Sequence, residues 1–252
     1  MNTKIDINAD IGEGYGHFIV GQDELIVPWL SSANIAVGMH AGDPMVLGKT
    51  LELCQRNKVA VGAHPGYMDL HNFGRRSIKM STSDFESLIL YQLGAFKALC
   101  DFKGLNFHHV KPHGALYNDL ASDLELSRHF ISIVQAFDPE LYVYGLPSSC
   151  IEEACHQSKI KFVSEVFLDR QYTPEGRLVP RTSENAVIHD VDVMIERMVK
   201  WLDTGLMRTV SGEYITLAGD TICIHGDQLQ GGMIAEKLVH SLQSKSITIE
   251  TL

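Results

Sequence analysis

The segment from Asn106 to Asn118, NFHHVKPHGALYN, begins as an apolar, β-rich run and stops at Pro112 and Gly114. Lys111 and His113 occupy the point where this predicted strand ends. Because they are two residues apart, they would face the same side of a pleated strand. An ammonium group beside an imidazole at a strand end is typical of an active site in a β/α barrel, whose chemistry lies at the carboxyl ends of its strands.

The same form, a buried strand that ends in a titratable group with glycine or proline, recurs along the whole chain. Strands are predicted at Lys4–Asp10, Ala33–Met39, Val59–Ala63, Leu141–Leu146, Phe162–Leu168 and Thr221–Ile224, besides the one that ends at Lys111. They alternate with amphipathic helices, as in a parallel sheet with right-handed crossovers. Polar groups follow nearly every strand, whereas an open sheet concentrates them at one switch point. We therefore predict an α/β protein with a parallel (β/α) barrel of about seven strands.

Several helix starts and loops can also be predicted. Asp43 before Pro44 indicates a helix that runs to about Asn57. The capping-box pattern predicts further helix starts at Ser83 with Glu86, Ser122 with Glu125, and Ser149 with Glu152. Gln171–Thr182 lacks periodicity and is predicted to be a functional or covering loop. Val210–Leu217 is predicted to form a small hairpin.

The composition suits an ordinary enzyme. The chain has 252 residues, 45% of them hydrophobic, which fits one barrel domain over residues 1–252. No run reaches the roughly 20 apolar residues of a membrane span, and the first residues show no signal-peptide pattern. The five cysteines form no CxxC pair, as expected for reduced thiols in a cytoplasmic protein. The formal net charge of −10 argues against a nucleic-acid partner.

In a barrel, the polar groups at the strand ends would gather at one mouth. These groups are Asp10, Glu13, His40, His64, Lys111, His113, Asp169, Arg170, His225 and Asp227. One such histidine could be a satisfied core residue, but four at four separate strand ends favour a site. Carboxylate and imidazole groups bind Zn²⁺ or a similar divalent ion. Asp10, His40 and His64 are the predicted metal ligands, although no close-spaced pair such as HExxH supports them.

A phosphate-binding loop is not predicted. Gly42–Thr50, GDPMVLGKT, has five residues between its glycines where the P-loop has four, and Pro44 starts a helix inside it. Lys49 is therefore expected on a helix surface. The sequence gives no support for nucleotide binding by this chain alone.

Six motifs now point to a family. They are DINADIGEGYG, NIAVGMHAGDP, AHPGYMD with FGRR, VKPHGALYN, LDRQYTPEGRLVPR and CIHGD, in order from Asp6 to Asp227. Together they resemble the LamB/YcsF family over nearly the full length. The resemblance implies a seven-stranded β/α barrel similar to the glycoside hydrolase/deacetylase fold. It also implies ATP-dependent opening of 5-oxo-L-proline to L-glutamate, together with two other 5-oxoprolinase subunits.

Opening a lactam needs an activated water, an acid for the leaving nitrogen and a cation for the developing oxyanion. We expect His113 to act as general base or acid, and Lys111 to stabilise the oxyanion or a phosphorylated intermediate. The other expected catalytic residues are Asp10, Glu13 and Asp227. Residues expected to bind substrate are Arg170, Arg75, Arg76, His225 and Asn118, with the arginines holding the substrate carboxylate.

Two alternatives stay open at this point. One is a metal-dependent deacetylase or carbohydrate hydrolase, on fold analogy alone. The other is a non-catalytic protein that presents substrate to a partner. ATP would be consumed by the complex and bound wholly or partly by the partner subunits. Alanine at His113 or Lys111 would lower turnover by about 10²-fold or more with little loss of stability.

Overall fold

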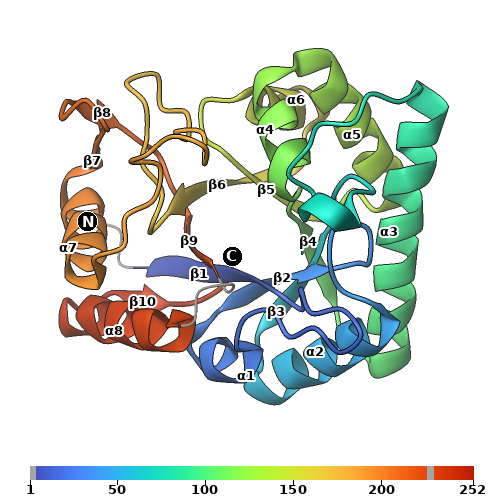
Figure 1. Cartoon of the computed structure of the whole chain (residues 1–252), viewed down its shortest axis with the longest axis horizontal. Coiled ribbons are helices and arrows are strands. Elements are labelled where there is room, and N and C mark those ends of the chain that lie inside the picture. The colour runs from blue at the N-terminus through green and yellow to red at the C-terminus, as the bar shows by residue number, and fades with distance from the viewer. Residues whose placement is uncertain (1–3, 226–229) are drawn as a thin grey trace.

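In a computed structural model that describes residues 4–225 and 230–252, parallel strands close into a barrel. The strands are β1 (Lys4–Ile11), β2 (Ser32–Ala36), β3 (Ala60–His64), β4 (Phe107–Val110), β5 (Tyr142–Gly145), β6 (Lys161–Phe167) and β9 (Thr221–His225). They lie in this order around the barrel, and β9 pairs with both β6 and β1 to close it. Figure 1 shows the helices arranged around the outside. The predicted seven-stranded (β/α) barrel is confirmed.

The helices follow the strands in sequence. They are α1 (Asp23–Ile26), η1 (Val27–Trp29), α2 (Pro44–Asn57), η2 (Leu70–Asn72), α3 (Thr82–Lys103), α4 (Gly114–Ser122), α5 (Leu124–Phe137), α6 (Cys150–Ser158), α7 (Val191–Thr204) and α8 (Gly231–Ser244). The predicted hairpin exists as β7 (Leu206–Arg208) and β8 (Tyr214–Thr216), outside the barrel. A short strand not predicted from the sequence, β10 (Thr248–Ile249), extends the sheet beside β1. Among the described residues, no helix has the length and apolar character needed to cross a membrane.

Two of the three helix starts predicted from capping boxes are wrong. Helix α3 begins earlier than expected, because Ser81 rather than Ser83 is its N-cap and accepts a hydrogen bond from the Asp84 amide. Helix α5 is capped by Asp123, whose carboxylate accepts from the Leu126 amide. Ser122 instead ends α4, a helix that the sequence analysis missed.

Other local predictions hold. Asp43 caps α2 and accepts from the amides of Met45 and Val46, and the helix ends at Asn57 as predicted. Ser149 is the N-cap of α6, but its hydroxyl donates to the Leu146 carbonyl instead of forming a capping box.

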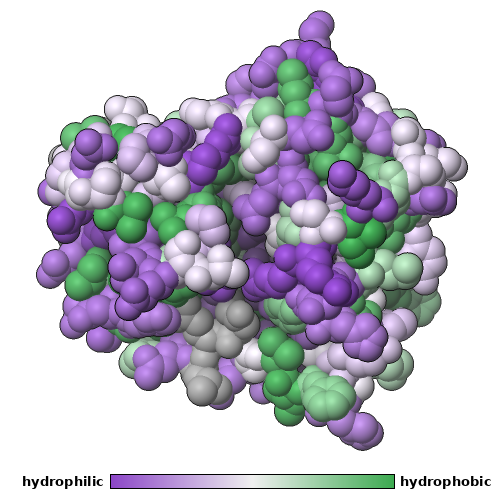
Figure 2. Space-filling view, turned by 45° about the horizontal axis from the view of Figure 1, so that its top comes forward, coloured by the Kyte–Doolittle hydropathy of each residue, from purple (hydrophilic) through white to green (hydrophobic). Residues whose placement is uncertain are grey.

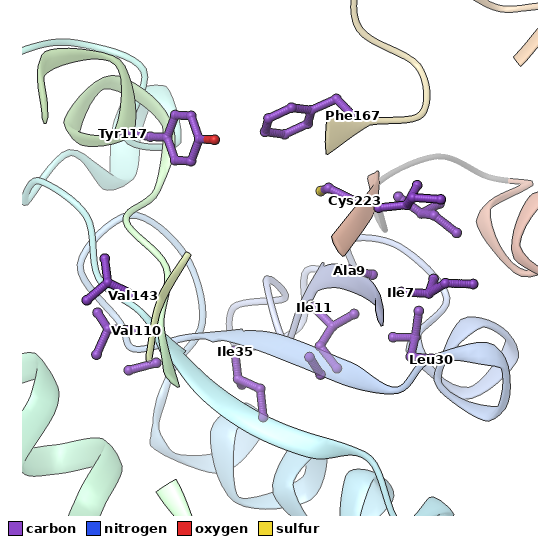
Figure 3. Packing of buried hydrophobic residues seen from close by; sticks show 14 of the residues in the cluster. Ile7, Ala9, Ile11, Leu30, Ile35, Val110, Tyr117, Val143, Phe167 and Cys223 are labelled. Atoms are coloured by element: carbon purple, nitrogen blue, oxygen red, sulfur yellow. The ribbon is translucent and has the colours of Figure 1, made fainter. Parts of the chain in front are cut away.

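The alternating sequence of β1 decides which side chains face the barrel axis. Ile7 and Ile11 are buried on the outer side, and Figure 3 shows Ile11 and Ile35 directed toward the helices. Asp6 and Asn8, on the opposite face of the strand, are equally buried but face the interior. The interior of this barrel is therefore polar, whereas branched apolar side chains fill most barrels of this type.

The polar interior begins at Asp6. Its carboxylate accepts hydrogen bonds from the hydroxyls of Ser31 at 2.6 Å, Ser32 at 2.8 Å and Thr221 at 2.5 Å. Burial raises the pKa of Asp6 above its ordinary value, and these hydrogen bonds oppose the rise. The hydrogen bonds satisfy a group that would otherwise be costly to bury.

The next layer holds an amide–imidazole chain. The Asn34 amide donates to Asn8 at 2.7 Å and to Asp10 at 2.9 Å, while the His109 Nε2 lies 2.8 Å from the Asn34 Oδ1. A side chain at Gly62 would lie 2.3 Å from the His109 ring, so only glycine leaves room for it. This chain supports Asp10 from below.

Candidate functional site

A pocket opens at the carboxyl ends of the strands. It is lined by Asp10, Glu13, His64, Arg75, Lys111, Pro112, His113, Gly114, Tyr117, Asn118, Phe167, Arg170, Leu178, Arg181 and His225. Figure 2 shows a recess near the centre of this face with hydrophilic residues beside it. In Figure 3 the rings of Tyr117 and Phe167 point toward one another across the barrel opening, and their centroids are 5.7 Å apart. The structure thus brings most of the predicted site residues to one mouth.

Two histidines of this pocket meet through ring nitrogens that carry no proton when both rings are neutral. The His64 Nδ1 lies 2.7 Å from the Lys111 carbonyl, and the His113 Nε2 lies 2.8 Å from the Phe73 carbonyl. Carbonyl oxygens only accept, so both of these nitrogens are protonated. The remaining nitrogens, His64 Nε2 and His113 Nδ1, are 2.9 Å apart. Two lone pairs repel at this distance, so the contact requires a shared proton or another cation between them.

Glu13 and His40 complete this cluster. Glu13 Oε1 lies 3.7 Å from His40 Nε2 and 3.8 Å from His113 Nδ1. The His40 ring stacks on the His113 ring with a centroid distance of 3.7 Å. Both ring nitrogens of His40 are buried without a hydrogen-bond partner among the described residues. Ligand atoms of Glu13, His40, His64 and His113 all lie within 4.8 Å of one another, so this buried cluster could hold a metal ion.

Burial keeps two of these imidazoles in the neutral form. It lowers the pKa of His40 and of His113 well below the ordinary value, and the charges of neighbouring histidines act in the same direction. Gly74 permits their close packing, because a side chain there would lie 2.7 Å from atoms of both residues. Neutral imidazoles are the form that binds metals and accepts protons.

Lys111 and two carboxylates form the floor of the pocket. The Lys111 Nζ lies 2.8 Å from Asp10 Oδ1, 2.6 Å from Glu165 Oε1 and 3.1 Å from Cys223 Sγ. Burial alone would lower the pKa of Lys111, but these acidic neighbours raise it well above the ordinary value. Burial likewise opposes ionisation of Asp10, while His64 and Lys111 hold its pKa well below the ordinary value. The floor is therefore a buried ion pair, and Asp10 Oδ2 lies 3.4 Å from His64 Nε2.

The His109 layer below this floor leads to a pH prediction. Burial, together with the charges of His108 and Lys111, lowers the pKa of His109 well below its ordinary value. The unfolded chain binds this proton near pH 6.5 and the folded chain does not, so the free energy of unfolding falls as the pH drops below about 6.5. Each such histidine contributes a slope of up to about 1.4 kcal/mol per pH unit.

We expect His109→Gln to reduce this slope, measured by urea unfolding between about pH 7.5 and 5.5. Glutamine keeps a donor for Asn34 but has no proton to gain. A control variant, His156→Gln, changes an exposed histidine on α6, outside the barrel, and should leave the slope nearly unaltered. An unchanged slope in His109→Gln would contradict the neutral buried state.

At the rim, His225 connects Asp169 to Arg181. The His225 Nδ1 lies 2.7 Å from the Asp169 carboxylate, and the Arg181 Nη2 lies 2.5 Å from the His225 Nε2. Burial opposes ionisation of Asp169, but His225 and Arg181 hold its pKa below the ordinary value. Arg181 was not among the predicted site residues, although it closes the motif LDRQYTPEGRLVPR.

The predicted arginines lie in different settings. Arg170 lines the pocket, but its guanidinium donates to the carbonyls of Val179 at 2.6 Å and Ala186 at 3.4 Å. Arg76 pairs with the buried Asp69 at 2.7 Å, and its side chain is not part of the pocket lining. Arg75 does line the pocket.

The remaining predictions concern Asn118 and Asp227. Asn118 lies at the rim, where its amide donates to the Gly114 carbonyl at 3.2 Å. Asp227, predicted to be catalytic, lies outside the described residues. Two of the three residues predicted as metal ligands, His40 and His64, belong to the cluster whose ligand atoms converge. Asp10 does not belong to it, and the other two members are Glu13 and His113.

Sequence and structure comparisons place these observations among known proteins. The model of the LamB/YcsF family matches residues 5–252. The chain is 41% identical over 250 residues to a protein of Oceanobacillus iheyensis named as the A subunit of 5-oxoprolinase, covering 99% of this chain and 97% of that one. A protein of the same name from Thermococcus onnurineus is 43% identical over 246 residues, covering 98% and 96%.

The crystal structure of a lactam utilization protein from Thermus thermophilus superposes with a TM-score of 0.93 at 36% identity, covering 99% of this chain and 100% of that one. A structure from Enterococcus faecalis, described as a candidate cellobiose-phosphate cleavage protein, has a TM-score of 0.58 at 9% identity. It covers 100% of this chain and 98% of that one. At that identity the likeness concerns the fold alone.

Proposed function

The chain belongs to the LamB/YcsF family, and we propose that its pocket opens the lactam ring of 5-oxo-L-proline to give L-glutamate. The observation that carries the proposal is the 2.9 Å contact at the pocket between His64 Nε2 and His113 Nδ1, two nitrogens that carry no proton when both rings are neutral. The names of the relatives, the A subunit of 5-oxoprolinase and the lactam utilization protein, agree with this chemistry.

The histidine pair can both take and return a proton. Water attacks the lactam carbonyl carbon, and the proton it loses moves to the pair, where it relieves the repulsion between the two nitrogens. Collapse of the tetrahedral species breaks the bond between the carbonyl carbon and the ring nitrogen, and the same proton passes to that nitrogen. Glu13, 3.8 Å from His113, orients the attacking water and favours the protonated pair.

Lys111 acts from beneath the site in this scheme. Its side chain is almost fully buried and is engaged by Asp10, Glu165 and Cys223, so we assign it the role of keeping Asp10 ionised. This differs from the oxyanion contact expected from the sequence. Ionised Asp10 lies 3.4 Å from His64 Nε2.

We also propose that the cluster of Glu13, His40, His64 and His113 binds a divalent metal ion. The partnerless nitrogens of His40 and the facing lone pairs of His64 and His113 fit such an ion. Ligand atoms around tetrahedral Zn²⁺ lie about 3.4 Å apart. Three of the separations here are 2.9, 3.7 and 3.8 Å, and all lie within 4.8 Å. A bound ion would polarise the lactam carbonyl and lower the pKa of water.

The metal proposal predicts direct binding. Titration of the metal-free chain with Zn²⁺ or Co²⁺, followed by calorimetry and by the Co²⁺ absorption spectrum, is expected to show one site. His40→Ala should weaken binding by at least about 10-fold, and His156→Ala, at the exposed histidine on α6, should not. If the chain binds no metal and the complex keeps full activity after exhaustive chelation, the ion is ruled out. A shared proton would then account for the contact between His64 and His113.

The reaction is further proposed to depend on ATP and on two partner subunits. Hydrolysis of a five-membered lactam releases little strain, and a catalyst lowers only barriers, so an energy source is required. ATP would supply it by phosphorylating the lactam carbonyl oxygen, after which one water opens the ring and a second water releases the phosphate. At Gly42–Thr50, the segment most like a phosphate loop, the carboxylate of Asp43 already occupies the helix N-terminus. This supports nucleotide binding by the partners.

All five cysteines are free thiols, which supports a cytoplasmic location.

Reconstitution tests this division of labour. The chain alone, the two partners alone and all three together are assayed for glutamate and phosphate release with ATP and 5-oxoproline. We expect coupled release from the complete set and none from the chain alone. Robust release by the purified chain would contradict the proposal, and acetate release from an acetylated sugar would favour a deacetylase instead.

A further inference from the structure

The rim of the pocket carries a positioned arginine that no catalytic step above uses. Arg181 donates to His225 Nε2 at 2.5 Å. A guanidinium has no acceptor, so this nitrogen of His225 must accept, and the imidazole carries its proton on Nδ1. That N–H in turn donates to Asp169 at 2.7 Å. The Asp169–His225 pair therefore holds Arg181 in one orientation.

His225 is itself fixed by its surroundings. The residue is only 8% exposed, and its ring stacks on Phe167 with centroids 5.7 Å apart. Arg181, in contrast, is exposed and lines the pocket, so donors other than the one used by His225 remain at the rim. A rigid support beneath an exposed guanidinium is the arrangement expected of a ligand contact, since less entropy is lost when the ligand binds.

The neighbouring Arg170 has a structural role. Arg170 is 6% exposed, and it donates to Val179 and Ala186, which flank Arg181 in the same loop. It therefore shapes the loop that carries Arg181. Burial, and then the charge of Arg181, lower the pKa of Arg170 to about 10.

Three arginines gather at this pocket although the whole molecule is acidic, and the carboxylates of Asp10 and Glu13 line the same pocket. The chain has a formal net charge of −10, yet Arg75, Arg170 and Arg181 all line one small pocket. Grouped cations repel one another, and an anion bound between them removes the repulsion. Planar guanidinium groups match carboxylates through two parallel hydrogen bonds.

We propose that Arg181 binds the carboxylate of the substrate and makes the pocket selective for small lactams that carry a carboxylate over neutral lactams. The inference rests on the proposed function, in which 5-oxo-L-proline is the substrate, and it adds the residue that recognises the carboxylate. Arg181 is the specificity-determining residue, and Asp169 and His225 are positioning residues that act through it. A phosphoryl group could occupy the same position at Arg181, so the experiment must distinguish it from the substrate carboxylate.

Binding to the purified full-length chain tests this without the partner subunits. Protein-observed NMR titrations, which reach millimolar dissociation constants, compare 5-oxo-L-proline with 2-pyrrolidinone, the same ring without the carboxylate. The variants are Arg181→Gln and Arg181→Lys. Arg208→Gln is the matched control, because this exposed arginine lies on the hairpin outside the pocket lining.

Wild-type chain is expected to prefer 5-oxoproline. Arg181→Gln should weaken the binding of 5-oxoproline by about 10-fold to 100-fold, because hydrogen bonds to a charged group are lost. The dissociation constant of 2-pyrrolidinone should stay unchanged. Arg181→Lys should recover part of the loss. Asp169→Leu should also reduce the preference, whereas Asp169→Asn, which still accepts from His225, should largely retain it. A purely structural role would weaken both ligands together.

Three results would overturn the inference. If Arg181→Gln binds 5-oxoproline as well as the wild type does, lactam binding stands but the carboxylate contact is wrong. If Arg181→Gln weakens inorganic phosphate and not 5-oxoproline, the rim serves a phosphoryl group. If the wild type binds neither lactam, the proposed function itself fails, and the inference fails with it.

Discussion

A reconstituted complex that carries His113→Ala is expected to lose about 10²-fold or more of its 5-oxoproline turnover. His113 Nδ1 lies 2.9 Å from His64 Nε2, and burial favours the neutral ring, in which this nitrogen carries no proton of its own. Alanine leaves His64 without the second nitrogen, so the proton from the attacking water has no shared position. Glutamate release at saturating ATP measures the effect.

The loss must be separated from misfolding and from failed assembly. Circular dichroism and gel filtration of the complex would show that the variant is folded and assembled. His156→Ala, at an exposed histidine on α6, should retain full turnover. Unchanged turnover in an assembled His113→Ala complex would place the chemistry elsewhere and favour a protein that only presents substrate.

The second large effect concerns stability. Lys111→Ala is expected to lower the free energy of unfolding by about 3–5 kcal/mol, because it leaves Asp10 and Glu165 as buried carboxylates without their cation. Glu165 is fully buried, so water does not replace the lost partner. The sequence alone predicted little loss of stability at this position. The burial of the ion pair reverses that expectation.

Urea unfolding at neutral pH checks the value. Lys97→Ala is the matched control: it removes a solvent-accessible ion pair with Asp101, spaced four residues along α3, and should destabilise the fold far less than Lys111→Ala does. Adding Glu165→Gln to Lys111→Ala should recover part of the loss, since one buried charge is then removed. Equal effects of Lys111→Ala and Lys97→Ala would mean that the buried pair is hydrated in solution.

Strand ends were the part of the site that the sequence could predict. His40, His64, His113 and His225 follow separate strands, and closure of the barrel brings them to one mouth. These inferences succeed because periodicity and barrel topology are set by backbone geometry.

Side-chain partners could not be predicted in the same way. Glu165 lies within a strand, where an isolated acid gives no sign of a buried lysine opposite it. Arg75 and Arg76 are adjacent in sequence, yet one lines the pocket and the other pairs with Asp69. Ser122 fits a capping pattern, but Asp123 beside it caps the helix. Each outcome depends on contacts between segments far apart in the chain or on competition between neighbours.

A crystal structure of the chain soaked with 5-oxo-L-proline tests the central claim most directly. The account predicts the lactam carbonyl beside Glu13, His64 and His113, with the carboxylate at Arg181. A ring bound outside this pocket, or bound with its carbonyl turned away from the histidine pair, would contradict it.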